Sequence, residues 1–228
     1  MDIRIISSMA TRRLLADLVA AFAPTSPGQH IEVESVGGVE AAQRIAAGEP
    51  FDAVVLAAAA LEALIAQRHV LADSRIDLVK SPMAVAVRHG AARPSIGSED
   101  EVQAAVLRSG RIGYSTGPSG DHLLGLLHRW GIASAVKDRL VQARPGIPVG
   151  SLVASGEVDL GFQQLSELLH VDGVEVLGLL PDPIQGTTTF AAGVTHASTQ
   201  PDRVRTLLAF MASPAVAAIK RENGMEPA

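Results

Sequence analysis

The sequence predicts a two-lobed α/β protein, in which each lobe is a mostly parallel sheet flanked by helices. Short apolar strands alternate with amphipathic helices, and the loop Ala91–Ser98, rich in Pro, Ser and Gly, separates two such series. The 228 residues suffice for two small cores. Those cores must consist of small aliphatic side chains, because 47% of the residues are hydrophobic but only one Trp, one Tyr and five Phe are present.

The first series covers roughly the first 70 residues. Its first helix is the clearest, because Leu14, Leu15 and Leu18 recur with helical spacing and fall on one face. Breakers such as Gly48 separate the elements. The predicted strands are Ile3–Ile6, Ile31–Val36 and Ala53–Leu56, and the predicted helices are Thr11–Phe22, Val39–Ala47 and Ala59–Gln67.

The second series lies between two longer predicted strands, Met83–Arg88 and Thr187–Val194. We interpret these strands as crossovers, so that one lobe comprises residues 1–83 and 190–228, the inserted lobe comprises residues 84–189, and a cleft separates them. The inserted lobe is predicted to contain helices at Val102–Leu107, Leu123–Trp130 and Val149–Ala154 and strands at Arg111–Tyr114, Leu160–Gln163 and Val174–Leu177. Helices near Asp202–Ala212 and Ala215–Glu222 end the chain.

Composition excludes several classes of function. The net charge is −5 and no basic stripe or aromatic ladder is present, which argues against a nucleic-acid partner. The chain has no Cys, its histidines lack metal-ligand spacing, and it contains neither a Rossmann fingerprint nor a Walker A motif. We therefore expect no disulfide, no metal and no cofactor. No apolar run approaches the roughly 20 residues of a membrane span, so membrane insertion is not expected.

The N-terminus bears on the compartment. Ile3–Ile6 reads directly as a strand, with no basic segment, apolar segment or cleavage site before it. As written, the sequence therefore predicts a cytoplasmic protein. A periplasmic location would follow if a signal segment had been removed.

Three turns join a predicted strand to a predicted helix and are candidate anion sites. They contain Ser7, Ser8 and Met9 in the first turn, Gly37 and Gly38 in the second, and Ser119 and Gly120 in the third. Free amides at a helix start, with the positive end of the helix dipole behind them, attract anions, and open α/β sheets bind ligands at the ends of parallel strands. The alternative is structural: Ser caps helices, and tight turns need Gly.

Other polar residues lie near these turns. Gln163 and Gln164 end a predicted strand, where amide groups suit ligand hydrogen bonds, although strand alternation lets only one of them face the cleft squarely. The charged candidates to pair with an anion are Arg12, Arg13, Arg144 and His122. Side chains of this kind are also common on a solvated surface.

With these elements in order, the whole chain resembles the molybdate-binding (ModA-like) group of class II periplasmic binding proteins, the substrate-binding components of ABC importers. The resemblance lies in Ile6–Leu15, Ser35–Ile45 with Gly48–Leu56, Ser115–Leu123 and Gly156–Leu168. It implies a two-lobe, hinge-closing fold, a small anionic ligand held between the lobes and, if the chain is exported, a membrane transporter as partner.

The family's ligand residues correspond only in part. Its first-turn serine falls on Met9 beside Ser8, its second-turn serine falls near Gly38, and its closing tyrosine falls at Gln164. The small residue of its third turn corresponds to Ser119. The resemblance thus implies the architecture and a small oxyanion, dicarboxylate or tricarboxylate ligand, rather than molybdate in particular.

The same family includes an enzyme, aconitate isomerase, so the resemblance leaves an alternative open. Isomerisation of an unsaturated polycarboxylate needs a general base and cations that hold the carboxylates. His122 or Glu167 is a candidate base, and Arg12, Arg13 or Arg144 a candidate cation. Absence of a signal segment favours such a cytoplasmic enzyme. A third interpretation is a ligand-sensing module of a regulator.

Overall fold

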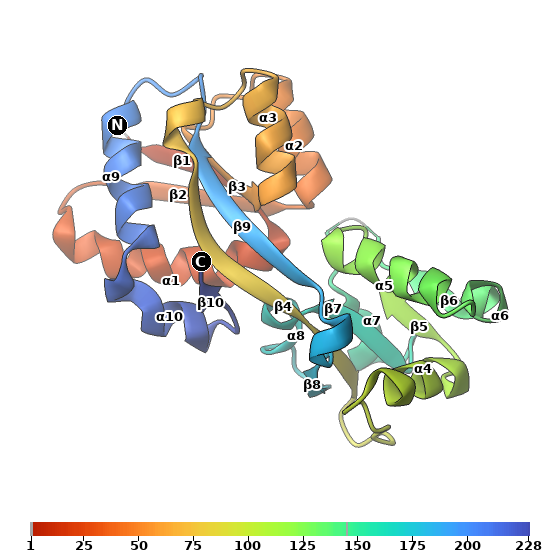
Figure 1. Ribbon diagram of the computed structural model, residues 1–228. Helices are drawn as coiled ribbons and strands as arrows, with labels where there is room; N and C mark the ends of the chain where they lie inside the picture. Colours follow the sequence, from red (N-terminus) through yellow and green to blue (C-terminus); the bar gives the residue numbers. More distant parts are fainter. Residues whose placement is uncertain (1, 145) are drawn as a thin grey trace. The chain divides into compact units, whose positions relative to one another are not determined.

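The computed structural model describes residues 2–144 and 146–228. The chain divides into two compact units, unit 1 with Met1–Lys80 and Thr188–Ala228 and unit 2 with Ser81–Thr187. Two strands, β4 (Ile76–Arg88) and β9 (Thr187–Val194), run from one unit into the other (Figure 1). The boundaries predicted from the sequence, after residues 83 and 189, lie a few residues further along the chain than the observed ones, after Lys80 and Thr187.

The sheet of unit 1 contains β1 (Ile3–Ser8), β2 (Ile31–Val36) and β3 (Ala53–Ala57). Its order is β2-β1-β3-β9; β1 is parallel to both β2 and β3, whereas β9 is antiparallel to β3. The short β10 (Glu226–Pro227) pairs antiparallel with β4. Because β1, β2 and β3 are parallel, they end together at what we call the carboxyl edge of unit 1.

Helices cover both faces of this sheet (Figure 1). Ile5 packs with Leu15 of α1, whereas the next residue, Ile6, packs with Ile45 of α2, because successive strand side chains point to opposite faces. The helices are α1 (Arg12–Phe22), α2 (Gly38–Ala46), α3 (Ala58–Ala66), α9 (Pro201–Ala212) and α10 (Ala217–Glu222), with short 3-10 turns η1 (Met9–Thr11), η2 (Ala23–Thr25), η3 (Ala72–Ser74) and η6 (Pro214–Val216).

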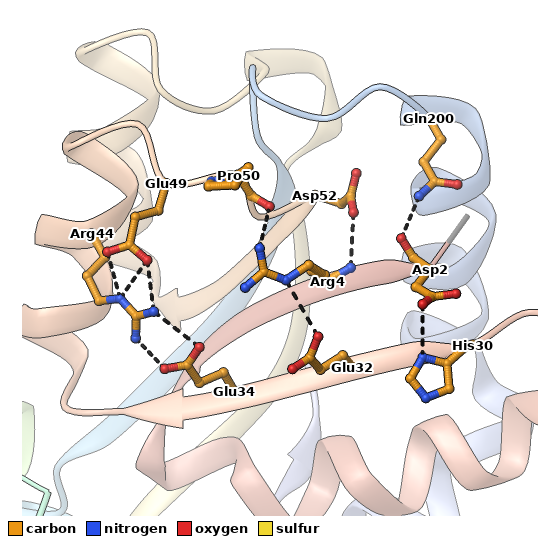
Figure 2. Close-up of polar contacts among 10 residues, drawn as sticks. All are labelled: Asp2, Arg4, His30, Glu32, Glu34, Arg44, Glu49, Pro50, Asp52 and Gln200. Atoms are coloured by element: carbon orange, nitrogen blue, oxygen red, sulfur yellow. Dashed lines mark hydrogen bonds and ion pairs between the residues drawn. The ribbon is translucent and has the colours of Figure 1, made fainter.

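A charged cluster joins α2 to the strands β1 and β2 of unit 1 (Figure 2). Arg44 of α2 forms ion pairs with Glu34 of β2 and with Glu49, the latter at 2.8 Å. The hydrogen bonds from Arg44 lower the pKa of both carboxyl groups. The guanidinium carbons of Arg4 and Arg44 also lie over the ring of the buried Phe51, at 4.7 and 5.2 Å from the ring centroid. The cluster ties α2 to the sheet, and its guanidinium groups are already engaged.

The sheet of unit 2 has the order β4-β7-β5-β6, with β8 paired to β4. β5 is parallel to β6 and β7, whereas β4 is antiparallel to β7 and β8. The remaining strands are β5 (Ile112–Tyr114), β6 (Leu140–Gln142), β7 (Leu160–Gln164) and β8 (Val174–Leu179). The parallel strands β5, β6 and β7 end at the carboxyl edge of unit 2.

Helices pack on both faces of this sheet, with α4, α5 and α6 in one cluster and α7 and α8 in two others. Val85 packs with residues of α4 and α5, and Ala84 packs with Leu168 of α8, while Val149 and Val153 of α7 form a further cluster. The helices are α4 (Glu99–Arg108), α5 (Pro118–Arg129), α6 (Ala133–Val136), α7 (Val149–Ser155) and α8 (Leu165–Leu168), with 3-10 turns η4 (Lys137–Arg139) and η5 (Asp182–Ile184). None of the helices in the described chain has the length and apolarity that a membrane crossing needs.

Several predicted boundaries were wrong. The first half of β4, which includes the exposed Lys80, was missed because it lacks a continuous apolar run. α4 begins at Glu99 because the Ser98 hydroxyl accepts a hydrogen bond from the Glu101 amide at 3.2 Å. α5 begins at Pro118 rather than Leu123, since Pro suits the first helical position. Ser119, Gly120 and His122 therefore lie within the helix. β6, α6, α8 and β10 were not predicted, and all are short.

Candidate functional site

Three helical segments begin at the carboxyl edge of unit 1. η1 and α1 follow β1, α2 follows β2, and α3 follows β3. Gly37 and Ala57 precede α2 and α3, and neither helix has a side-chain cap in the described structure. First-turn amides of an uncapped helix are hydrogen-bond donors with a positive dipole behind them. This edge can therefore receive an anion.

Ser8 is the most telling residue at this edge. Its side chain is buried, with 7% exposed, and within the described chain its hydroxyl has no hydrogen-bond partner. The first residue of α2, Gly38, lies beside it: a Cβ at Gly38 would be 3.7 Å from the Ser8 Cβ. A buried hydroxyl without a partner is destabilising, so a bound ligand that accepts or donates here would satisfy it.

The other predicted residues of unit 1 have different environments. The Ser7 hydroxyl is already paired with that of Ser35 at 2.8 Å, and Ser7 is fully buried. Met9 begins η1 and is half-buried, as is Gly37. Arg12 is the first residue of α1, and both Arg12 and the following Arg13 are exposed to solvent. The structure thus separates the Ser7 hydroxyl, which has a partner, from the Ser8 hydroxyl, which has none among the described residues.

The carboxyl edge of unit 2 contains the turn after β5. The hydroxyl groups of Ser115 and Ser119 are 2.9 Å apart, and Ser115 accepts a hydrogen bond from the Gly117 amide at 3.2 Å. Ser119 is 2% exposed. Gly120 is required by packing, because a Cβ there would lie 1.9 Å from the Ser115 carbonyl oxygen. The turn is held by its own hydrogen bonds and places one half-buried hydroxyl, that of Ser115, before α5.

His122 is committed to a structural contact. Its Nε2 lies 2.8 Å from the Ile184 carbonyl oxygen, and a carbonyl only accepts, so Nε2 carries the proton. The ring packs against Gly186, where a Cβ would come within 2.7 Å of Cδ2. This contact fixes the tautomer and leaves Nδ1 as the nitrogen that can accept a proton, so it orients His122 and does not exclude it as a general base.

Glu167 has a different setting. Gln163 is 2% exposed; its Oε1 accepts a hydrogen bond from the Val149 amide at 2.7 Å, and its amide group donates to the Glu167 carboxylate. Burial raises the pKa of Glu167 to about 7, against the opposing effect of the hydrogen bond from Gln163. A half-buried carboxyl group, oriented by an amide and titrating near neutrality, has the properties of a general base.

Two predicted residues of this edge remain. Gln164, 2% exposed, ends β7 and precedes α8; in the strand register it is opposite Met83. Arg144, exposed to solvent, follows β6. Pro145, which stiffens the predicted turn after Arg144, lies outside the described residues.

Sequence reasoning missed two features of these edges. The start of α3 at Ala58 was predicted within one residue as a helix start but not as a candidate anion site, because Ala57 to Ala60 are all alanine and offer no polar side chain. The Val149 amide, which orients Gln163, belongs to the backbone and is likewise invisible in sequence. Among the residues that the structure describes, no group of three or more His, Asp or Glu side chains could hold a metal ion.

Comparisons with known proteins agree with this architecture. The model of one protein family, described as bacterial extracellular solute-binding protein, matches residues 3–226. The chain is 38% identical over 186 residues to an aconitate isomerase of Pseudomonas sp, which covers 81% of this chain and 70% of that protein.

Two solved structures of similar fold are named for the small anions that they bind. A periplasmic molybdate-binding protein of Azotobacter vinelandii aligns with a TM-score of 0.81 at 20% identity, covering 98% of each chain. The sulfate-binding protein SubI of Mycobacterium tuberculosis H37Rv aligns with a TM-score of 0.77 at 16% identity, over 100% of this chain and 87% of that one. These likenesses show the fold, and they confirm the fold class predicted from the sequence.

Proposed function

Because the chain belongs to the bacterial extracellular solute-binding protein family, we propose that it binds a small anion at the carboxyl edge of the sheet of unit 1. The buried Ser8 hydroxyl without a partner, beside the uncapped start of α2, is the observation that carries the proposal. The contacts would be backbone amides and hydroxyl groups, which bind anions without opposing charge.

We favour a small polycarboxylate as the ligand. An aconitate isomerase is 38% identical to the chain, whereas the molybdate- and sulfate-binding structures are 20% and 16% identical. By the resemblance to molybdate-binding proteins, three of the four corresponding contact positions are Met9, Gly38 and Gln164, none of which has a hydroxyl group, and the fourth is Ser119. Loss of hydroxyl donors disfavours a compact tetrahedral oxyanion.

Thermal unfolding across a ligand panel tests this function. The panel is cis-aconitate, trans-aconitate, citrate, molybdate, tungstate, sulfate and phosphate. A ligand at a hundredfold its Kd stabilises the fold by about 2.7 kcal/mol, which corresponds to a shift of several degrees in Tm. We expect the shift with a polycarboxylate, and a strong shift with molybdate alone would overturn that assignment.

A serine variant locates the binding. Ser8→Ala should weaken the selected ligand about tenfold, because one charge-assisted hydrogen bond is lost. Ser95→Ala, an exposed serine in the loop after β4, should bind as the wild type does. Equal Kd values for Ser8→Ala and wild type would remove Ser8 from the site. A double variant, Ser119→Ala with Gln164→Ala, tests the carboxyl edge of unit 2 in the same way.

A second candidate function is isomerisation of an unsaturated polycarboxylate. It is favoured by the aconitate isomerase relative and by Glu167, whose carboxyl group is oriented by Gln163. In this reaction Glu167 would take a proton from the CH₂ carbon beside a carboxylate and return one to the other end of the three-carbon unit. The double bond moves, no net proton is consumed, and no oxidant is needed.

Proton exchange separates binder from enzyme. Incubation with trans-aconitate in D₂O, followed by ¹H NMR, should show the cis isomer and deuterium in both isomers. Glu167→Gln should abolish the exchange while the ligand still raises Tm. If the wild-type protein binds trans-aconitate but shows no deuterium exchange, catalysis on this substrate is excluded and the anion-binding function remains. Exchange that survives in Glu167→Gln would exclude Glu167 as the base.

A further inference from the structure

Unit 2 contains a cavity that none of the candidate residues above line. Its volume is about 560 Å³. Leu160, the first residue of β7, lines the cavity, whereas Gln164 ends the same strand at the carboxyl edge. The cavity therefore lies at the opposite end of the sheet from Ser119 and Glu167. Its volume is within the range of small-molecule sites.

Three arginines from different elements line this cavity. Arg88 ends β4, Arg108 ends α4, and Arg93 belongs to the intervening loop. Arg93 forms an ion pair with Glu175 at 2.8 Å. Across residues 2–144 and 146–228, the side chains of Arg88 and Arg108 make no hydrogen bond or ion pair. Two guanidinium groups are thus available at a single cavity, on a chain whose net charge is −5.

The negative groups around the cavity accept hydrogen bonds from neighbouring donors. Carbonyl groups at the end of a helix repel anions, but Arg139 donates to the Leu107 and Ser109 oxygens at 3.0 and 2.6 Å. Asp159 also lines the cavity, and its Oδ2 accepts a hydrogen bond from the Arg111 amide at 2.8 Å. These contacts leave the arginines as the main donors toward the cavity.

The remaining lining is small. A Cβ at Gly156 would lie 3.1 Å from an Arg88 guanidinium nitrogen, so this guanidinium rests directly on the backbone. Gly156 has a φ of 76°, a conformation that side chains rarely adopt. Ala91, Ala92 and Gly110 complete the small-residue lining. Small residues keep the volume open between the arginines.

We propose that this cavity is a second anion site, which binds a small molecule with at least two phosphate or carboxylate groups through Arg88 and Arg108. A guanidinium presents its donors as a planar fork that matches both groups. A single anionic charge would engage only one of the two forks, so a polyvalent ligand is favoured. The site goes beyond the proposed function and does not depend on it.

Titration with pyrophosphate and with citrate, followed by ¹H–¹⁵N NMR, tests the site. We expect the Gly110 and Gly156 amide signals to shift with a single Kd for each ligand, and acetate to give no shift at equal ionic strength. Arg88→Ala with Arg108→Ala should weaken this Kd about tenfold or more. The control is a double variant that also removes two positive charges, Lys137→Ala with Arg203→Ala, and it should bind each ligand with the wild-type Kd. Both control side chains are exposed and lie outside the cavity lining.

Glu175→Gln provides a gain-of-binding variant. It removes the carboxylate that pairs with Arg93 and should tighten both Kd values several-fold. Equal Kd values in the wild type and the Arg88→Ala, Arg108→Ala variant would overturn the proposal. So would the absence of shifts at Gly110 and Gly156 in the wild type. A response to citrate but not pyrophosphate would assign the site to polycarboxylates, and the reverse to phosphates.

Discussion

The side chain of Gln163 connects the first amide of α7 to the carboxyl group of Glu167. Its Oε1 accepts from the Val149 amide at 2.7 Å, which turns its amide group toward Glu167. Gln163 is thus engaged on both sides, and the titratable group of this pair is Glu167 in α8. A carboxyl group with a raised pKa has consequences for stability as well as for chemistry.

Stability should fall as pH rises because of Glu167. Its folded pKa of about 7 exceeds the ordinary value of 4.5, so the folded protein holds more protons than the unfolded chain between these pH values. Glu167→Gln should therefore be more stable than wild type at pH 8, by roughly 1 to 3 kcal/mol, and about equal at pH 4.5. Urea unfolding at the two pH values measures the difference. A difference that does not change with pH would contradict the expectation.

Gly38→Ala should block the ligand without unfolding the protein. The added methyl group would sit 3.7 Å from the Ser8 Cβ, an ordinary van der Waals distance, but it would cover the hydroxyl. We expect Tm without ligand to change by no more than about 2 °C, while Kd rises at least about tenfold. Gly125→Ala, in the exposed part of α5, should leave Kd unchanged. Wild-type affinity in Gly38→Ala would exclude a ligand at Ser8.

Two glycines of α5 should respond to alanine in opposite directions. At Gly120 the new Cβ would lie 1.9 Å from the Ser115 carbonyl oxygen, so the turn must shift, at a cost of about 2 kcal/mol or more. At Gly125 nothing lies within 4 Å, and alanine should stabilise the helix by about 0.5 to 1 kcal/mol. Chemical unfolding of both variants measures the contrast. Equal effects would mean that Gly120 is not required by packing.

The buried Lys220 should reduce stability at neutral pH. It is 1% exposed, and burial lowers its pKa from the ordinary 10.5. Between the lowered pKa of the folded protein and 10.5 the unfolded chain binds more protons than the folded protein, so stability rises with pH through this window. Lys220→Met should be about 1 kcal/mol more stable than wild type at pH 7, with a smaller gain at pH 10. The exposed Lys137→Met is the control. A gain that grows with pH would be inconsistent with this cause.

The fold was predictable because its signals are local. The apolar run of Ile3–Ile6 and the helical spacing of Leu14 and Leu18 place a strand and a helix without reference to distant residues, and the structure has both. Short elements were missed for the same reason. The three residues of β6 show no periodicity of their own and are defined only by pairing with β5.

The sequence by itself determined the α/β class, the glycine- and serine-rich turns at the strand ends, and the absence of thiol chemistry. Tertiary structure decided what each side chain in those turns can do. The Ser7 hydroxyl is paired with Ser35, 28 residues away, while the Ser8 hydroxyl finds no partner in the part of the chain that the structure describes, and His122 is held by Ile184, 62 residues away. Local periodicity follows from chain neighbours, whereas hydrogen-bond partners, burial and pKa depend on residues that only folding brings together.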